Sequence, residues 1–133
     1  MATLEKVLLA YVAAWSETDE EKRRALLEMC WADLGIYSDP SAEIPGREAL
    51  VQHIGRSLRH FVGHRILLTS GVEEHHNRIR FTWAMVDPNG RSVIEGIDFG
   101  ELGADGRLVR ITGFFGAPPP LPPSWPADQV LQG

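Results

Sequence analysis

The chain has 133 residues, and its hydrophobic fraction of 44% and charged fraction of 23% suit one ordinary globular domain with a real core. Its formal net charge of −5 argues against a nucleic-acid-binding surface. The single cysteine, Cys30, excludes an internal disulfide and favours a reducing, cytoplasmic location. We expect neither a signal peptide nor a membrane-spanning segment, because no apolar run has the length or flanking charges of either.

Three helices are expected in the first half of the chain, over residues 3–16, 19–30 and 47–61. Each places its apolar side chains at helical spacing, which predicts one buried face per helix. In "TDEE", Thr18 is the predicted N-cap of the second helix, and Glu21 follows three residues later as in a capping box.

A short strand is expected at "GIYSDP", where Pro40 would stop it. After residue 63 the hydrophobic period changes from helical to two, which indicates strands. Four long strands are expected, at 64–75, 78–87, 92–103 and 107–116. The segments "PNGR" and "ADGR" between the last three are typical of two-residue hairpin turns. Helices followed by an antiparallel meander predict an α+β fold with segregated layers.

The end of the chain, "APPPLPPSWPADQVLQG", is too rich in proline for a helix or a central strand. We expect a domain over residues 1–116 and an extended, proline-rich tail over residues 117–133.

The direction of Asp98 in the strand "VIEGIDFGEL" decides whether it has a function. The first hairpin turn would pair Asp98 with Phe81 and Gly96 with Trp83, and the second would pair Asp98 with Gly113. Directly paired residues share a face of the sheet, so both registers place Asp98 on the more apolar face. A carboxyl group there needs a hydrogen-bond partner or a raised pKa, and such groups concentrate at functional sites. The same registers pair Val86 with Val93, Gly100 with Ile111 and Glu101 with Arg110.

The opposite face of the sheet mixes charged residues with Val93, Ile97, Phe99 and Phe114. This face is too apolar for an ordinary solvent-exposed surface, and we expect it to form a homodimer interface. The alternative is that the proline-rich tail covers it, with Trp125 as an anchor.

The segments "YVAAW", "WADLGIYSDP", "EIPGREAL" and "GIDFGEL…DGRLVRITGFFG" resemble the nuclear transport factor 2-like superfamily. Within it they are most similar to the SnoaL-like and ketosteroid isomerase-like branches, over about residues 4–116. The resemblance implies a cone-shaped α+β roll, in which three N-terminal helices pack into a strongly curved mixed or antiparallel sheet around a pocket.

The resemblance also implies catalytic roles for Tyr11 in "YVAA", Asp39 in "DP" and Asp98 in "ID". Asp39 would be the base that moves a proton next to a ketone, and Tyr11 and a protonated Asp98 would donate hydrogen bonds to its oxygen. A tyrosine hydroxyl and a neutral carboxylic acid can both donate. The expected substrate-binding residues are Trp15, Phe81, Trp83, Met85, Ile111 and Phe115.

Other interpretations remain open. In a SnoaL-like cyclase, Asp98 would be the acid and base, and Asp39 would be secondary. In a non-catalytic ligand-binding or dimerisation module, Tyr11 would be a core residue and Asp39 would begin a turn. The partner expected in most of these cases is an apolar small molecule, with no nucleic acid and no membrane. No metal or other cofactor is expected, because the spacing of the histidines does not suggest metal ligands.

Overall fold

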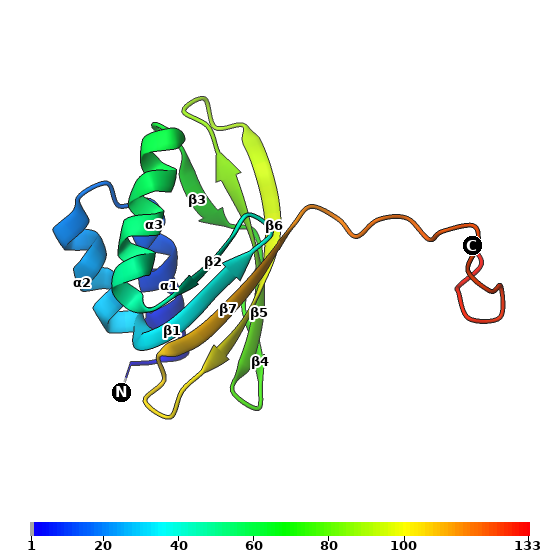
Figure 1. The fold of residues 1–133 in the computed structure, drawn as a ribbon, viewed down its shortest axis with the longest axis horizontal. Helices are drawn as coiled ribbons and strands as arrows, with labels where there is room; N and C mark the ends of the chain where they lie inside the picture. Colours follow the sequence, from blue (N-terminus) through cyan, green and yellow to red (C-terminus); the bar gives the residue numbers. More distant parts are fainter. Residues whose placement is uncertain (1) are drawn as a thin grey trace.

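The structure is a computed structural model that describes residues 2–133. In it, helices cover one face of a curved, seven-stranded mixed sheet, which confirms the predicted α+β class (Figure 1). The helices are α1 (Leu4–Ala14), α2 (Glu20–Cys30) and α3 (Arg47–His60). The strands are β1 (Trp31–Asp39), β2 (Ala42–Pro45), β3 (Arg65–Leu68), β4 (Glu73–His75), β5 (Arg78–Val86), β6 (Ser92–Leu102) and β7 (Leu108–Phe115).

The strands are ordered β2-β1-β7-β6-β5-β3, with β4 also beside β5. Strand β1 runs parallel to β7, whereas the other pairs are antiparallel. The short strand β2, which forms a hairpin with β1, was not predicted. The single strand expected over residues 64–75 is wrong, because the chain breaks into β3 and β4. At the break, the Ser70 hydroxyl accepts a hydrogen bond from the Thr82 amide at 2.8 Å, in place of a backbone ladder bond.

The predicted inner register of the β5–β6 and β6–β7 pairs is confirmed. Asp98 pairs with both Phe81 and Gly113, and Trp83 pairs with Gly96. Next to the turns the prediction is wrong, since Val86 pairs with Ser92 instead of Val93. The expected pairs Gly100–Ile111 and Glu101–Arg110 are present.

The turns differ from the predicted ones, although the inner register is the same. The first is closed by a bond from the Asp87 amide to the Arg91 carbonyl, and the second by one from the Gly103 amide to the Arg107 carbonyl. Each hairpin therefore has a three-residue loop followed by a register shift in the ladder. A bulge adds one residue to one strand, which restores the pairing that a two-residue turn would give.

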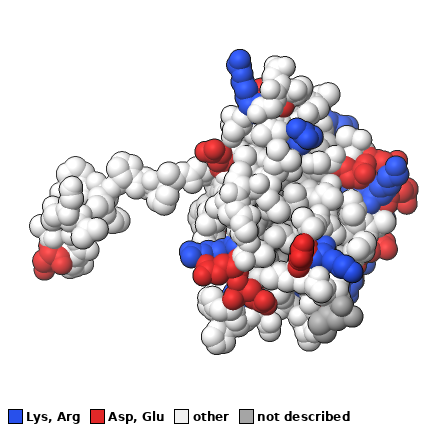
Figure 2. Space-filling view, turned by 180° about the vertical axis from the view of Figure 1, so that it is seen from behind, with Lys and Arg blue, Asp and Glu red and all other residues white. Residues whose placement is uncertain are grey.

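The outer face of the sheet exposes large apolar side chains. Phe99 and Phe114 are 43% and 55% exposed, and their rings meet edge to face at 6.4 Å. The tail, residues 117–133, leads away from the domain and does not cover this face, so that alternative is wrong (Figure 1). Figure 2 shows the tail as uncharged for most of its length, while charged side chains are scattered over the domain. The homodimer stays a prediction, which sedimentation equilibrium can test.

No helix within residues 2–133 is long and apolar enough to cross a membrane.

Helix α2 begins one residue later than the capping pattern predicts. Its N-cap is Asp19, whose carboxylate accepts from the Lys22 amide at 2.9 Å. Thr18 is therefore not the N-cap, and its backbone carbonyl instead accepts a hydrogen bond from the Arg23 side chain at 3.2 Å. The negative charge of Asp19 at the start of the helix also interacts favourably with the helix dipole.

Arg23 ties α2 to α3 from a buried position, with only 3% of its surface exposed. Its guanidinium donates to three backbone carbonyls, those of Glu17 at 3.0 Å, Thr18 at 3.2 Å and Val51 at 2.9 Å. Gly55 leaves room for it, since a Cβ there would lie 2.8 Å from Arg23 Nη1. These contacts use the charge to satisfy backbone groups, so we assign Arg23 a structural role.

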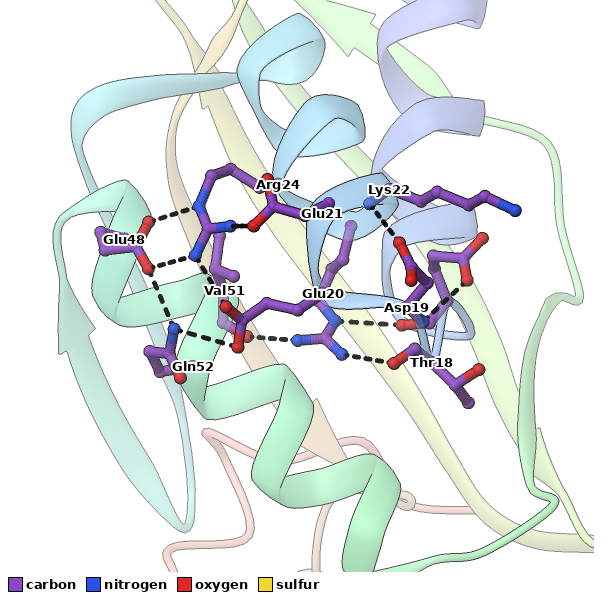
Figure 3. A network of polar contacts seen from close by, with 11 residues as sticks. Thr18, Asp19, Glu20, Glu21, Lys22, Arg24, Glu48, Val51 and Gln52 are labelled. Atoms are coloured by element: carbon purple, nitrogen blue, oxygen red, sulfur yellow. Dashed lines mark hydrogen bonds and ion pairs between the residues drawn. The ribbon is translucent and has the colours of Figure 1, made fainter.

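Arg24 makes a surface network instead (Figure 3). Its guanidinium donates to both carboxylate oxygens of Glu48 at 2.8 Å and also pairs with Glu20 and Glu21. Gln52 donates to Glu48 at 3.0 Å. Hydrogen bonds from Arg24 hold the pKa of Glu48 at about 2, below its usual value. The carboxylates are largely exposed, so solvent screens the network and its contribution to stability is small.

The two arginines give a matched pair of variants. Arg23→Met is expected to lower the free energy of unfolding by about 2–3 kcal/mol, because partly and fully buried carbonyls lose their donor. Arg24→Met is expected to lower it by less than about 1 kcal/mol. Urea unfolding of both variants measures the difference. Similar losses in the two would contradict the structural role assigned to Arg23.

Candidate functional site

A cavity of about 460 Å³ lies between the helices and the inner face of the sheet. Its inner end is lined by buried side chains such as Tyr11, Phe81 and Asp98. Four lining residues are exposed and mark its open side: Ser41, Arg56, His60 and Phe115. The lining is predominantly apolar, with a few polar groups. Its size and character suit an apolar small molecule that is oriented by those polar groups.

A second hollow, of about 600 Å³, lies on the outer face of the sheet. Glu73, Arg78, Arg80 and Glu101 line much of it, and Arg80 and Glu73 form an exposed ion pair there. Solvated charges of this kind are common on protein surfaces. The inner cavity is the better candidate site, because it contains buried titratable groups.

The structure brings Tyr11, Asp39 and Asp98 to the wall of the inner cavity. The predicted apolar residues that also line it are Trp15, Phe81, Trp83, Met85 and Phe115. Ile111 is the exception, because it is fully buried in the core and does not line the cavity. It pairs with Gly100, and a Cβ at Gly100 would lie 2.9 Å from its Cδ1 atom. Its side chain therefore packs over Gly100, further along the strand than Asp98.

Asp98 is 5% exposed and is held by one specific hydrogen bond, in which Trp83 Nε1 donates to its Oδ1 at 2.9 Å. Burial raises the pKa of Asp98 to about 7, the Trp83 bond partly opposes this, and the charge of Asp39 adds to it. A large share of Asp98 is therefore neutral at physiological pH. Since Oδ1 accepts from Trp83, Oδ2 is the oxygen that would carry the proton and donate to a ligand.

Two glycines make room for the Trp83–Asp98 pair. A Cβ at Gly96 would lie 2.3 Å from Trp83 Cζ2, so the indole packs flat against the backbone there. A Cβ at Gly113 would lie 2.7 Å from Asp98 Oδ1 and 3.7 Å from the Cβ of Asp39. The distances of 2.3 Å and 2.7 Å are shorter than real Cβ contacts, so a side chain at either glycine would displace Trp83 or Asp98. Gly113 also shows that the two aspartates lie next to each other on the inner face.

Asp39, at the end of β1, is fixed by three donors. The Tyr37 hydroxyl donates to its Oδ2 at 2.5 Å, and the amide and hydroxyl of Ser41 donate to its Oδ1 at 2.7 Å each. A carboxylate offers about four acceptor positions, so about one stays free for a proton or a ligand. Burial, together with the bond to Asp39, keeps the pKa of Tyr37 well above its usual value, and Tyr37 stays a donor.

Tyr11 is 2% exposed, and its ring stacks on Trp31 at 5.6 Å and meets the edge of Trp15 at 6.5 Å. Its hydroxyl has no hydrogen-bond partner of normal geometry within residues 2–133. Burial first, and then the charge of Asp98, holds the pKa of Tyr11 well above its usual value. The nearby Trp15 side chain opposes this as a hydrogen-bond donor, although its geometry is not that of a normal hydrogen bond. The group is therefore a neutral O–H. A buried polar group without a partner is costly, and such groups are rare in native proteins.

Helix α3 adds a polar stripe to the cavity wall that the sequence reasoning missed. His53, Arg56, Ser57 and His60 all line the cavity, at the i, i+3, i+4, i+7 spacing of one helix face. Burial lowers the pKa of His53, against the opposing effect of the Asp39 charge. The helical spacing of these polar residues was the available signal, but spacing alone does not show that this face of α3 lines the cavity. No group of three metal-binding side chains exists within residues 2–133.

Tyr37 was also missed. It stands two residues before Asp39 in β1, so strand alternation places both side chains on one face.

Comparison with known proteins begins with two negative results, since no family model matches the chain and no curated protein is significantly similar to it. Solved structures are similar. A SnoaL-like family protein from Agrobacterium tumefaciens str. C58 is 32% identical, with a TM-score of 0.79, over 84% of this chain and 95% of that chain. An NTF2-like protein from Exiguobacterium sp. 255-15 is 20% identical, with a TM-score of 0.66, over 83% and 98%. A SnoaL-like protein from Jannaschia sp. CCS1 is 12% identical, with a TM-score of 0.62, over 84% and 85%.

Three helices packed against a curved mixed sheet, with a cavity between the layers, define an α+β fold that the chain shares with the NTF2-like protein from Exiguobacterium and the SnoaL-like protein from Jannaschia. The identity of 32% to the Agrobacterium protein, over nearly all of that chain, is more specific. The chain belongs to the SnoaL-like family. The resemblance drawn from the sequence motifs is confirmed at this level.

Proposed function

We propose that the protein binds an apolar small molecule with a ketone group in the inner cavity and catalyses proton transfer next to that ketone without a cofactor. The observation that carries this proposal is the buried Tyr11 hydroxyl, which belongs to a residue of the cavity wall and has no partner of normal geometry within residues 2–133. A ligand oxygen would satisfy it. Two relatives support the reaction class: the Agrobacterium protein is designated a candidate isomerase, and the Jannaschia protein a candidate polyketide cyclase.

In the proposed reaction, Asp39 removes a proton from the carbon next to the ketone, and the electron pair moves onto the ketone oxygen. Tyr11 and neutral Asp98 donate hydrogen bonds to that oxygen as it gains charge. In an isomerisation, Asp39 then returns the proton to a different carbon. In a cyclisation, the enolate carbon instead forms a bond to the carbon of a second carbonyl of the same molecule. The π electrons of that carbonyl move onto its oxygen, which takes up the proton from Asp39.

The division of labour between the two acids follows from their surroundings. Asp98 has a raised pKa because it is buried with one indole donor, and so it keeps a proton to donate. Asp39 is held at the cavity wall by hydroxyl and amide donors of Tyr37 and Ser41. Tyr37 and Ser41 act as positioning residues, because they hold Asp39 but leave one acceptor position free.

The test is an ultraviolet assay for conjugated enone formation from two β,γ-unsaturated ketones, a ketosteroid and the smaller cyclohex-3-enone. The wild type is expected to turn over at least one of them. Tyr11→Phe is expected to lower kcat by about 10²–10³-fold, because one oxyanion donor is lost. The same variant should unfold at an equal or slightly higher urea concentration, since it removes an unsatisfied buried hydroxyl.

Two results would go against this proposal. Equal kcat in the wild type and Tyr11→Phe would remove Tyr11 from the reaction. Quenching of Trp15 and Trp83 fluorescence by both ketones, with no enone formed from either, would instead support a ligand-binding protein without isomerase activity.

A further inference from the structure

The polar groups of the cavity are unevenly distributed. Tyr11, Asp39 and Asp98 project from α1, β1 and β6, whereas the polar stripe of α3 lies along a different wall. At the start of the stripe, His53 packs against Trp15 at 6.0 Å and Tyr37 at 5.9 Å. A ligand whose ketone is held by Tyr11 and Asp98 would therefore extend past a second set of polar side chains.

Arg56 is the residue of that stripe whose charge does not depend on pH in the physiological range. It is the one Lys or Arg side chain among the described residues that line the cavity. It takes part in none of the ion pairs found within residues 2–133. The same holds for Arg59, Arg65, Arg78 and Arg91, but these do not line the cavity. A cation at the mouth of an apolar cavity, without a protein counter-ion, can bind an anionic group of a ligand.

The cavity wall also carries Asp39, whose oxygens are already bonded to Tyr37 and Ser41. Asp39, His53 and Arg56 all line the same cavity. Along α3 the stripe continues from His53 past Arg56 to His60. His60 lies about 10 Å from His53 along the helix axis, at 1.5 Å per residue. An anion beside Arg56 and His60 can thus be several ångströms away from the acceptor oxygens of Asp39.

We propose that the ligand of this cavity is a keto acid, and that Arg56 binds its carboxylate at the cavity mouth with Ser57 and His60 as further donors. This inference rests on the proposed function and gives it a substrate class. The ketone would be held at the buried end by Tyr11 and Asp98, the apolar body would contact Phe81, Trp83 and Met85, and the acid group would stay at the exposed end. The charge then costs little desolvation, because it never enters the apolar part of the cavity.

The experiment uses two probes of nearly equal shape, 6-acetyl-2-naphthoate and the corresponding primary amide, in which the naphthalene separates the ketone from the acid group. Binding is measured by quenching of Trp15 and Trp83 fluorescence and, independently, by calorimetry. The wild type is expected to bind the acid at least about tenfold more tightly than the amide, as a charge-assisted hydrogen bond would give. The preference should shrink in 0.5 M NaCl, because Arg56 is exposed and salt screens it.

Arg56→Gln is expected to abolish the preference by weakening acid binding about tenfold, with amide binding unchanged. Arg59→Gln is the matched control. It removes the same charge from the same helix, but Arg59 does not line the cavity. Arg59 lies near Arg23 instead, since a Cβ at Gly55 would be 3.3 Å from the Nη1 atom of Arg59. Arg59→Gln should keep the full preference for the acid.

The failures can be told apart. Equal binding of acid and amide by the wild type would overturn the keto acid inference but leave the proposed proton transfer standing. A preference that survives in Arg56→Gln, or is lost equally in Arg59→Gln, would overturn the role of Arg56. Binding of neither probe, together with no enone formation, would overturn both proposals.

Discussion

Asp39→Asn is expected to lower kcat for proton transfer by about 10²–10⁴-fold, with a much smaller change in KM, because the variant keeps the shape of the site but lacks its base. An asparagine carbonyl can still accept the hydrogen bond that Tyr37 donates to Asp39 Oδ2 at 2.5 Å. It cannot take up a proton from carbon. The measurement is steady-state kinetics of enone formation for the wild type and the variant.

Asp33→Asn is the control for this prediction. Asp33 belongs to the same strand, its side chain is 82% exposed, and its contact with Arg47 is a long one of 4.0 Å. It should change kcat by less than about twofold, since an exposed pair of this kind contributes little. If Asp39→Asn and Asp33→Asn both retain the wild-type kcat, Asp39 is not the base.

Asp98→Asn is expected to change how stability depends on pH. Burial raises the pKa of Asp98 from 3.8 to about 7 in the folded protein. Between about pH 4 and pH 7 the folded protein therefore holds a proton that the unfolded chain has released. The free energy of unfolding falls as pH rises through this range, and the loss is complete above about pH 7. At one pKa unit per 1.36 kcal/mol, the loss is on the order of 4 kcal/mol.

The asparagine variant has no proton to lose at this position, and its side-chain oxygen can still accept from Trp83. Its stability relative to the wild type should thus increase between pH 4 and pH 7 and then level off. Urea unfolding of both proteins from pH 4.5 to pH 8.5 measures this difference in stability. The pH-dependent contributions of other groups, such as Glu48 with its lowered pKa, are the same in both proteins and cancel. A difference that is constant with pH would show that Asp98 has an ordinary pKa.

The sequence was informative about the fold and about Asp98 for a physical reason. Strand residues alternate between two faces, and turn residues set which strands are adjacent, so paired positions such as Phe81 and Asp98 can be worked out from the chain alone. The prediction survived an error in the turn because a bulge compensated for the longer loop. The resemblance then supplied Tyr11 and Asp39, whose position on the cavity wall no local pattern could give.

The parts that were missed depend on tertiary packing. Which wall of the cavity a helix faces is decided by how α3 packs on the sheet, so the stripe with His53 and Arg56 could be seen in the sequence but not placed. Ile111 was assigned to the cavity because it shares a face with Asp98. A face of a strand can pass from a cavity into a packed core, and alternation does not show where this happens.

The two glycines beside the Trp83–Asp98 pair link positions that would otherwise vary independently. A side chain at Gly113 cannot coexist with the Asp98 carboxylate in its present place, and one at Gly96 cannot coexist with the Trp83 indole. A relative that replaces either glycine must also have changed the partner or moved it. In related sequences of this fold, a residue other than glycine at position 113 therefore marks a cavity in which this acid is absent or differently placed, and so a site with a different arrangement of donors.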